Sequence, residues 1–276
     1  MSIKYAYLGP AGTFTEAALQ KIATQSDQLI AYANVTAALD AVRNGGCQKA
    51  LVPIENSVEG VVARTLDELA IGEPLVITAE TTLPVSFSLM TLSDKNPAEI
   101  KSIATHPHAE SQCRSFIAKN YPNAQVIESS STAAAAKGLS KGDYDAAIAG
   151  SNAAKNYDLK VIAENIGDNT GAITRFVLVE KPGNQPKATG KDRTSLAVFI
   201  ALDHAGALLE ILNEFAKHQV NLTFIQSRPT GSQLGHYHFI IDAEGHIEDK
   251  PISAALAGLK EICEDVRFLG SYPQAK

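Results

Sequence analysis

Residues 4–18 read KYAYLGPAGTFTEAA, and their order of elements decides the fold. The apolar run at the start predicts a short buried strand, and the GPAG that follows it predicts a turn. Thr13 is followed three residues later by Glu16, the pairing of a capping box, which opens a helix. A strand, a small polar turn and a helix therefore follow one another closely.

The same order recurs through residue 180. Further strand-like runs lie at residues 29–33, 50–54, 102–105, 125–127 and 145–149, and helical patterns follow them. Strands that alternate with helices in this way predict an α/β fold whose strands are largely parallel.

The pattern changes after residue 180. Residues 181–187 (KPGNQPK) are polar and interrupted by proline and glycine, so we expect a linker over 183–192 between domains 1–182 and 193–276. The second domain is expected to contain, in order, a strand at 194–201, a helix at 207–217, strands at 221–228 and 236–242, a helix at 252–263 and a strand at 266–271. That βαββαβ order is ferredoxin-like. A domain of this size is marginal alone, which favours pairing across subunits.

Composition excludes several classes of protein. The net charge is −6 and the Lys and Arg residues are scattered, which argues against nucleic-acid binding. The sequence has no run of 18 uncharged apolar residues and no signal-like N-terminus, so no membrane span is expected and a cytoplasmic location is. Cys47, Cys113 and Cys263 are widely separated, and neither they nor the histidines predict a metal site.

Small polar pairs follow the predicted strands of the first domain. They are Gly12-Thr13, Asn56-Ser57, Thr105-His106, Ser131-Thr132 and Gly150-Ser151. Helix starts favour anions, and in an open α/β sheet these junctions meet at the carboxyl edge of the strands. Together they favour a small anionic ligand, although each one alone is also explained as an ordinary helix cap.

These stretches resemble the motifs of prephenate dehydratases. The resemblance rests on residues 7–18 (YLGPAGTFTEAA) and 52–60 (VPIENSVEG), and then on Thr105-His106-Pro107, Gln112-Cys113, Ser131-Thr132-Ala133, Ala147-Ile148-Ala149 and Thr174-Arg175-Phe176. It implies a catalytic domain of two α/β lobes, like the type II periplasmic binding proteins, with the site between them. We place the lobe crossings near residues 80–84 and 162–166.

The reaction that the family implies removes CO2 and hydroxide from prephenate and leaves phenylpyruvate. It needs no metal or organic cofactor. By this resemblance Thr174 hydrogen-bonds the leaving hydroxyl. Arg175 binds a carboxylate, since its planar fork matches one, or it forms an ion pair between the lobes. Phe176 is either a wall of the site or part of the core.

Substrate contacts are expected from residues that donate to anions, with one carboxylate among them. The donors are Thr13, Asn56, Ser57, Ser131 and Thr132. Glu55 is a proton source if it is buried, or otherwise a structural cap. The sequence departs from the family at Ala172, where Asn is usual and for which Asn169 is a possible substitute, and at His108, where Gln is common.

The second domain resembles an ACT domain. Residues 203–209 (DHAGALL) and 226–229 (QSRP) are similar to its phenylalanine-binding motifs, with Ala205 in place of Pro and Gln226 in place of Glu. The resemblance implies effector binding by Gly206, Ala207, Leu208, Gln226, Ser227, Arg228 and Pro229. Gly206 either lets the ligand approach the backbone closely or forms a tight turn. The resemblance also implies paired ACT domains in a homodimer or homotetramer that binds L-phenylalanine at the interface.

Two other functions fit the same residues. Arogenate dehydratase performs the same chemistry on an amino acid, and the sequence does not distinguish it from the enzyme acting on prephenate. A non-catalytic ligand sensor would also combine such lobes with an ACT domain. A transcription regulator would need a helix-turn-helix, for which no residues remain.

Overall fold

The computed structural model describes residues 2–92, 95–200, 204–230 and 237–275. They form two compact units, and each unit is assembled from separate segments of the chain. The first comprises Met1–Ala38, Leu51–Val61 and Thr82–Phe176, and the second comprises Leu39–Ala50, Val62–Thr81 and Val177–Lys276. Several elements of the first sheet contribute residues to both units.

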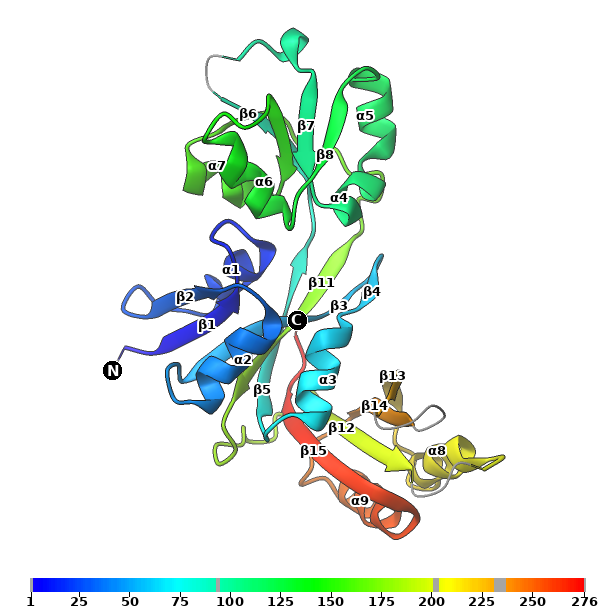
Figure 1. Ribbon diagram of the computed structural model, residues 1–276. Helices are drawn as coiled ribbons and strands as arrows, with labels where there is room; N and C mark the ends of the chain where they lie inside the picture. The colour runs from blue at the N-terminus through cyan, green and yellow to red at the C-terminus, as the bar shows by residue number, and fades with distance from the viewer. Residues whose placement is uncertain (1, 93–94, 201–203, 231–236, 276) are drawn as a thin grey trace. The chain divides into compact units, whose positions relative to one another are not determined.

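The first sheet has the strand order β2-β1-β3-β11-β5, and β4 pairs with β3 (Figure 1). Its strands are β1 (Lys4–Leu8), β2 (Gln28–Tyr32), β3 (Lys49–Asn56), β4 (Gly60–Val61), β5 (Val76–Pro84) and β11 (Ile173–Glu180). The parallel pairing of β1 with β2 is the arrangement that the sequence predicts for this region. The helices of this part are α1 (Phe14–Leu19), α2 (Val35–Arg43) and α3 (Ala63–Ile71).

One local expectation was wrong. The sequence predicted that Asn56-Ser57 would join a strand directly to a helix, but the chain first forms a hairpin. β4 runs antiparallel to β3 with Asn56 opposite Gly60, and α3 begins only at Ala63. Gly60 has a φ of 82°, a backbone conformation that glycine adopts without steric cost, so it permits this tight reversal.

The second sheet has the strand order β10-β6-β9-β7-β8. Its elements are β6 (Ser88–Thr91), β7 (Ser102–Thr105), β8 (Gln125–Glu128), β9 (Ala146–Ala149), β10 (Lys160–Ala163), a 3-10 turn η1 (Pro97–Glu99), α4 (Pro107–Gln112), α5 (Arg114–Asn120), α6 (Thr132–Leu139) and α7 (Ser151–Tyr157). Its strands bury both faces. Leu89 joins a core with α4 and α5, whereas the adjacent Met90 joins one with α6 and α7 (Figure 1).

The chain crosses between these two sheets twice. It leaves the first sheet after β5 and enters the second at β6, and it returns between β10 and β11. The two crossings are hydrogen-bonded to each other, since Val85 N donates to Ala172 O at 2.7 Å and Ile166 N donates to Phe87 O at 3.0 Å. Ala172 is therefore a buried backbone partner of the first crossing.

The third sheet confirms the predicted βαββαβ order. Its strands are arranged β13-β14-β12-β15. The elements are β12 (Asp192–Ile200), α8 (Ala207–Lys217), β13 (Leu222–Pro229), β14 (Tyr237–Glu244), α9 (Lys250–Ile262) and β15 (Cys263–Pro273). β15 is longer than predicted because it pairs with β12 along almost its full length. The end of the strand expected at 194–201 and the start of the strand expected at 236–242 lie outside the described residues.

Helices α8 and α9 cover one face of the third sheet. Leu196 and Val198 of β12 and Ile241 of β14 pack there against Phe215 of α8 and Leu259 of α9. Residues that alternate with these along the strands point to the opposite face.

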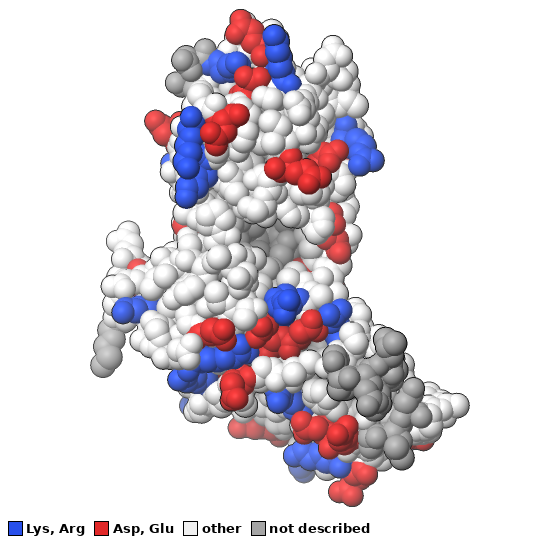
Figure 2. All heavy atoms as spheres, viewed as in Figure 1, with Lys and Arg blue, Asp and Glu red and all other residues white. Residues whose placement is uncertain are grey.

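Two further properties concern the described part of the chain. Each of its helices falls short of the length and hydropathy that a membrane-spanning helix requires. No group of three or more His, Cys, Asp and Glu side chains within it could hold a metal ion. On the face shown in Figure 2, basic and acidic side chains are interspersed.

Candidate functional site

The hydrogen bond between Asn56 and Thr174 joins two of the predicted site residues, which are 118 positions apart in sequence. Asn56 lies at the end of β3, and Thr174 lies at the start of β11, the neighbouring strand. The Asn56 Nδ2 donates to Thr174 Oγ1 at 2.8 Å. The Asn56 Oδ1 accepts from the amides of Val58 and Glu59 at 2.9 and 3.0 Å. Those two bonds fix the amide so that its NH2 group faces the threonine.

The direction of that hydrogen bond determines what Thr174 can do. Because its oxygen accepts from Asn56, its own hydrogen is available to donate to a third group. The Thr174 side chain lies at the carboxyl end of β3 and is buried. A hydroxyl held in this way is a preorganised hydrogen-bond donor.

Ser57 extends the same group. Its backbone amide donates to Ile173 O at 2.9 Å, and its Oγ accepts from Ile173 N at 2.9 Å. The Ser57 hydroxyl hydrogen therefore also remains available to donate. Asn56 and Ser57, in the hairpin turn rather than at a helix start, are thus brought together with Thr174 at the start of β11.

Arg175 and Glu55 form a second pair on the same two strands. Their Nη1 and Oε2 atoms are 4.0 Å apart, and the arginine is buried whereas the Glu55 side chain is 38% exposed. Arg175 directly follows Thr174 on β11, and its guanidinium lies near the Glu55 carboxylate at the end of β3. The ion pair lies within one sheet and not between the lobes. The choice between a proton source and a structural cap for Glu55 stays open as a prediction.

Phe176 is 1% exposed and packs in the protein interior. This degree of burial matches the core role among the two that were considered for it.

Thr13 caps α1, as the capping box predicts. Its hydroxyl donates to Leu8 O at 3.0 Å and accepts from Glu16 N at 3.3 Å. The Glu16 side chain reaches back one residue further than in a standard capping box and accepts from Gly12 N at 2.6 Å. These side-chain hydrogen bonds of Thr13 are local to the turn that it closes.

Glu16 is also the centre of a buried network that the sequence did not reveal. It accepts from the Tyr7 hydroxyl at 3.1 Å and from Asn156 Nδ2 at 2.8 Å. Burial, followed by the adjacent Glu16 charge, raises the pKa of Tyr7 well above its usual range. A second bond, from Asn152 Nδ2 to Thr13 O at 3.0 Å, also reaches this turn from α7. Asn152 and Asn156 are four residues apart on one helix face, which is the only sequence signal that could have indicated the network.

Gly12 allows this close packing. Its φ is 88°, and a Cβ there would lie 3.2 Å from both Ala153 and the Tyr157 ring. The Tyr157 hydroxyl donates to Ala11 O at 2.7 Å. The turn after β1 is therefore held firmly against α7.

Ser131 and Thr132 lie at the start of α6. Ser131 is the N-cap, and its Oγ accepts from Ala134 N at 3.0 Å. Thr132 is the first helical residue. Within the described residues, no hydrogen bond joins either of them to Asn56 or Thr174. Ser131 thus caps α6, and a substrate contact by these two residues stays a prediction.

The hairpin turn also contacts α4. Gln112 Nε2 donates to Glu59 Oε1 at 2.8 Å, and His108 Nδ1 lies 3.7 Å from Glu59 Oε2. Burial, followed by the neighbouring His108, lowers the pKa of His106. The family motif contained Gln112, but its partner Glu59 lies 53 positions away and was not foreseen.

The predicted effector residues of the first ACT motif surround the start of α8. Gly206 is its N-cap with a φ of 101°, and no atom of the described chain lies within 4 Å of the Cβ position. Ala207 lines a cavity of about 170 Å³ together with Ile200, His204, Glu210, Ile211, Ile262 and Cys263. That volume is below the roughly 300–1,000 Å³ usual for small-molecule sites. Leu208 is exposed, and Asp203 lies outside the described residues.

The second ACT motif is divided between the two faces of the third sheet. Ser227 is opposite Phe239, which belongs to the helix-side core. The next residue, Arg228, is opposite His238 on the other face. The motif therefore does not present its consecutive side chains in one direction.

The remaining contacts of this motif lie within the chain. Gln226 Nε2 donates to Ser227 O at 3.0 Å, and Pro229 ends the strand. Arg228 is bound to Asp67 of α3 by two hydrogen bonds of 2.8 Å. The arginine thus contacts a helix far away in sequence.

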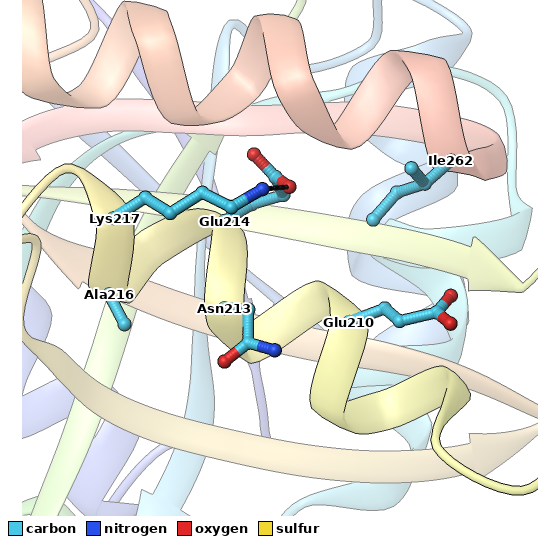
Figure 3. Close-up of a pocket in the computed structure, with 6 residues that line it drawn as sticks. All are labelled: Glu210, Asn213, Glu214, Ala216, Lys217 and Ile262. Atoms are coloured by element: carbon cyan, nitrogen blue, oxygen red, sulfur yellow. Dashed lines mark hydrogen bonds and ion pairs between the residues drawn. The ribbon is translucent and has the colours of Figure 1, made fainter.

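An open groove of about 620 Å³ runs along α8 (Figure 3). Its lining residues are Glu210, Asn213, Glu214, Ala216, Lys217 and Ile262. Figure 3 shows Lys217 turned toward Glu214, with which it forms an ion pair. None of these side chains belongs to the predicted effector set.

Comparison with known proteins decides the family. The family model "Prephenate dehydratase" matches residues 5–184, and the model "ACT domain" matches residues 194–261. The chain belongs to the prephenate dehydratase family. Prephenate dehydratases are lyases, so this chain is an enzyme of the lyase type.

Individual relatives agree along nearly the whole chain. A prephenate dehydratase of Amycolatopsis methanolica is 46% identical over 99% of this chain and 89% of its own length. The crystal structure of prephenate dehydratase in complex with L-Phe from Arthrobacter aurescens has a TM-score of 0.92 and 48% identity over 98% of this chain and 90% of its own. GqqA, described as a novel type of quorum quenching acylase, has a TM-score of 0.86 and 26% identity over 98% of both chains.

Proposed function

We propose that this prephenate dehydratase converts prephenate to phenylpyruvate for L-phenylalanine synthesis and is inhibited by L-phenylalanine. The observation that carries the proposal is the hydrogen bond from Asn56 to Thr174, which leaves the threonine hydroxyl as a donor. Family membership supplies the reaction class.

In the proposed reaction, the bond between C1 and its carboxylate breaks and releases CO2. Its electron pair makes the ring aromatic as the bond from C4 to its hydroxyl breaks. The hydroxide must take up a proton to leave as water. A donor aimed at that oxygen lowers the barrier because negative charge develops there in the transition state.

Thr174 supplies that hydrogen bond, and Asn56 is the residue that orients it. Ser57, whose hydroxyl is also available to donate, is proposed to bind a substrate carboxylate. A threonine hydroxyl is too weak an acid to be the sole proton source, so the proton itself comes from another group or from water. General-acid assistance of this kind contributes about 10² to 10⁴ in rate.

Arg175 is proposed to hold the second carboxylate of the substrate, with Glu55 as its resting partner. The 4.0 Å separation in the present ion pair is long for a strong hydrogen bond, so a carboxylate ligand would be a better partner. Phe176 supports this strand from the core. Thr13, Ser131 and Thr132 are proposed to contribute by fixing the helix starts that face the substrate.

We also propose the division into a catalytic domain at 1–182, a linker at 183–192 and a regulatory domain at 193–276. The regulatory part is proposed to bind L-phenylalanine in paired ACT domains of a homodimer or homotetramer. Two observations support this. The Arthrobacter relative was crystallised with L-Phe, and the cavity beside Ala207 is too small to enclose such a ligand from one chain alone.

The test is a direct assay of the purified chain with prephenate and with arogenate, following phenylpyruvate and phenylalanine as products. Turnover of prephenate with inhibition by added L-phenylalanine is the expected result. Preference for arogenate would assign the amino-acid analogue as substrate. Binding of either compound without turnover would make the chain a ligand sensor.

An acylase activity, as described for GqqA, is a second candidate that the same assay panel can include. An acylase needs a nucleophile activated by an adjacent base. Among the described residues, the hydroxyls of Ser57 and Thr174 have hydrogen-bond partners in Ile173 N and the Asn56 amide, neither of which is a base. The site therefore favours the dehydratase.

A further inference from the structure

Arg228 and Asp67 form a bidentate ion pair between the third sheet and α3. The guanidinium Nε and Nη2 donate to Asp67 Oδ1 and Oδ2, both at 2.8 Å, across 161 positions of sequence. The side chains are only 22% and 29% exposed. A bidentate pair fixes orientation as well as distance, even where the side chains remain partly exposed. Hydrogen bonding to the carboxylate raises the pKa of Arg228 further.

A buried histidine lies next to this ion pair on the neighbouring strand. His238, opposite Arg228 on β14, is fully buried and stacks on Phe199 with ring centroids 5.0 Å apart. Neither ring nitrogen of His238 has a hydrogen-bond partner among the described residues. Burial lowers the pKa of this histidine, which favours the neutral ring beside the ion pair. Arg228 and Asp67 are thus joined beside a buried ring while both remain partly exposed.

Helix α3 is held at a second point by the same sheet. Arg267 of β15 donates from Nη1 to Gly72 O, at the C-cap of α3, at 2.7 Å. Nearby, a Cβ on Gly270 would lie 2.2 Å from Ile77 O. The third sheet therefore contacts α3 at both Asp67 and Gly72. A movement of β13 relative to the rest of the sheet would displace Asp67 and so would move the helix.

Helix α3 follows closely after the hairpin that contains Asn56. The helix begins at Ala63, two residues after Val61, and Val61 pairs with Glu55 in the hairpin whose turn begins at Asn56. Only Val62 separates the end of β4 from the start of α3. Asn56 in turn orients the Thr174 hydroxyl.

We infer that Arg228 does not bind the effector but transmits its effect, through Asp67 and α3, to the turn that orients Thr174. The inference rests on the proposed inhibition by L-phenylalanine and names the contact that carries it. Arg228 belongs to the second ACT motif, but the guanidinium edge formed by Nε and Nη2 is committed to Asp67. A ligand shifts a conformational equilibrium only through contacts that differ between the states, and the inference makes this pair one of those contacts.

The experiment separates binding of L-phenylalanine from inhibition by it, in the full-length enzyme. Asp67→Asn removes the charge and one acceptor while keeping the shape. Asp40→Asn is the matched control, since Asp40 also pairs with an arginine, Arg43, on a helix of the same unit. For each protein, prephenate turnover is measured against L-phenylalanine concentration, and L-phenylalanine binding is measured by calorimetry without substrate.

Asp67→Asn should bind L-phenylalanine within about threefold of the parent, while the turnover that remains at saturating L-phenylalanine should be about tenfold higher than in the parent. Asp40→Asn should match the parent in both measurements. Exchanging the charges, with Asp67→Arg and Arg228→Asp together, should restore inhibition. If Asp67→Asn fails to fold, this exchanged pair decides the matter, since it must be inhibited for the inference to stand.

Three results would overturn the inference. One is an Asp67→Asn enzyme that is inhibited like the parent. Another is loss of L-phenylalanine binding in a folded Asp67→Asn protein, which would place the pair in the effector site itself. The third is a parent enzyme that turns over prephenate but does not respond to L-phenylalanine. A parent that does not turn over prephenate would instead refute the proposed function, and calorimetry would still report whether L-phenylalanine binds.

Discussion

The site around Asn56 and the region around Arg228 were equally well marked by sequence motifs, but the structure treats them differently. At the first, residues from two distant motifs meet in a direct hydrogen bond of 2.8 Å. At the second, adjacent residues of one motif diverge, with Ser227 and Arg228 on opposite faces of a strand. The side chains of Ser227 and Arg228 therefore point in opposite directions from β13, because successive strand residues alternate in direction.

The two regions therefore differ in how many of the interactions of each site are supplied within one chain. The catalytic group has its orienting partner within the described chain, so single substitutions there should act on turnover directly. The effector group has a small cavity, an open backbone position at Gly206 and an arginine committed elsewhere. Substitutions there should act on regulation and leave turnover intact.

Thr174→Ala should have the largest effect of these substitutions, and it should reduce turnover at the catalytic site. Loss of the oriented hydroxyl removes a hydrogen bond made in the transition state, so kcat should fall by about 10² or more. Thr174→Ser, which keeps the hydroxyl, is the control and should retain most of the activity. Steady-state kinetics on protein whose circular dichroism matches the parent would measure both. A folded Thr174→Ala enzyme with near-normal kcat would remove Thr174 from the mechanism.

Asn56→Asp tests the direction of the hydrogen bond. An ionised carboxylate at this position can still accept from the amides of Val58 and Glu59, but it cannot donate to Thr174. The threonine hydroxyl would then donate to that carboxylate and lose its free hydrogen. We expect kcat to fall by about 10-fold to 100-fold with little loss of stability. Unchanged kcat in this variant would show that the orientation of Thr174 is unimportant.

The sequence could predict those features of the two regions that depend on residues close together in the chain. It could not predict those that depend on residues far apart in the chain. The α/β pattern, the capping box at Thr13 and Glu16 and the βαββαβ order depend on local periodicity, and all three were found. The hairpin at Asn56 was missed because β4 has only two residues, too few to show a strand pattern. Asp67 lies in an amphipathic helix, where a charged residue is usually solvated. No local pattern could have paired it with an arginine 161 positions away.

Arg175→Lys tests whether Arg175, which pairs with Glu55, binds the substrate. Lysine keeps the charge but not the planar fork, so a carboxylate would be held less well. We expect KM to rise by about tenfold with kcat changed less. Glu55→Gln is the paired control, because it removes the resting ion pair without touching the guanidinium. If Arg175→Lys behaves like the parent while Glu55→Gln does not, the substrate depends on Glu55 instead.

Gly206→Ala should have the smallest effect of these substitutions. It should change the response to L-phenylalanine and leave kcat without effector unchanged. Its φ of 101° is unfavourable for alanine, at a cost of about 1–2 kcal/mol, but the described chain leaves open space at the Cβ position. Any change in the response to L-phenylalanine beyond that strain therefore reports a ligand or a second chain at this point. Gly190→Ala is the matched control, since Gly190 has a φ of 82°, equally open surroundings and no place in either ACT motif. We expect both variants to lose similar thermal stability and to keep kcat without effector. Only Gly206→Ala should then need several times more L-phenylalanine for half-inhibition. If the two glycine variants respond identically, the α8 start plays no part in effector binding, and the two regions differ less than the structure indicates.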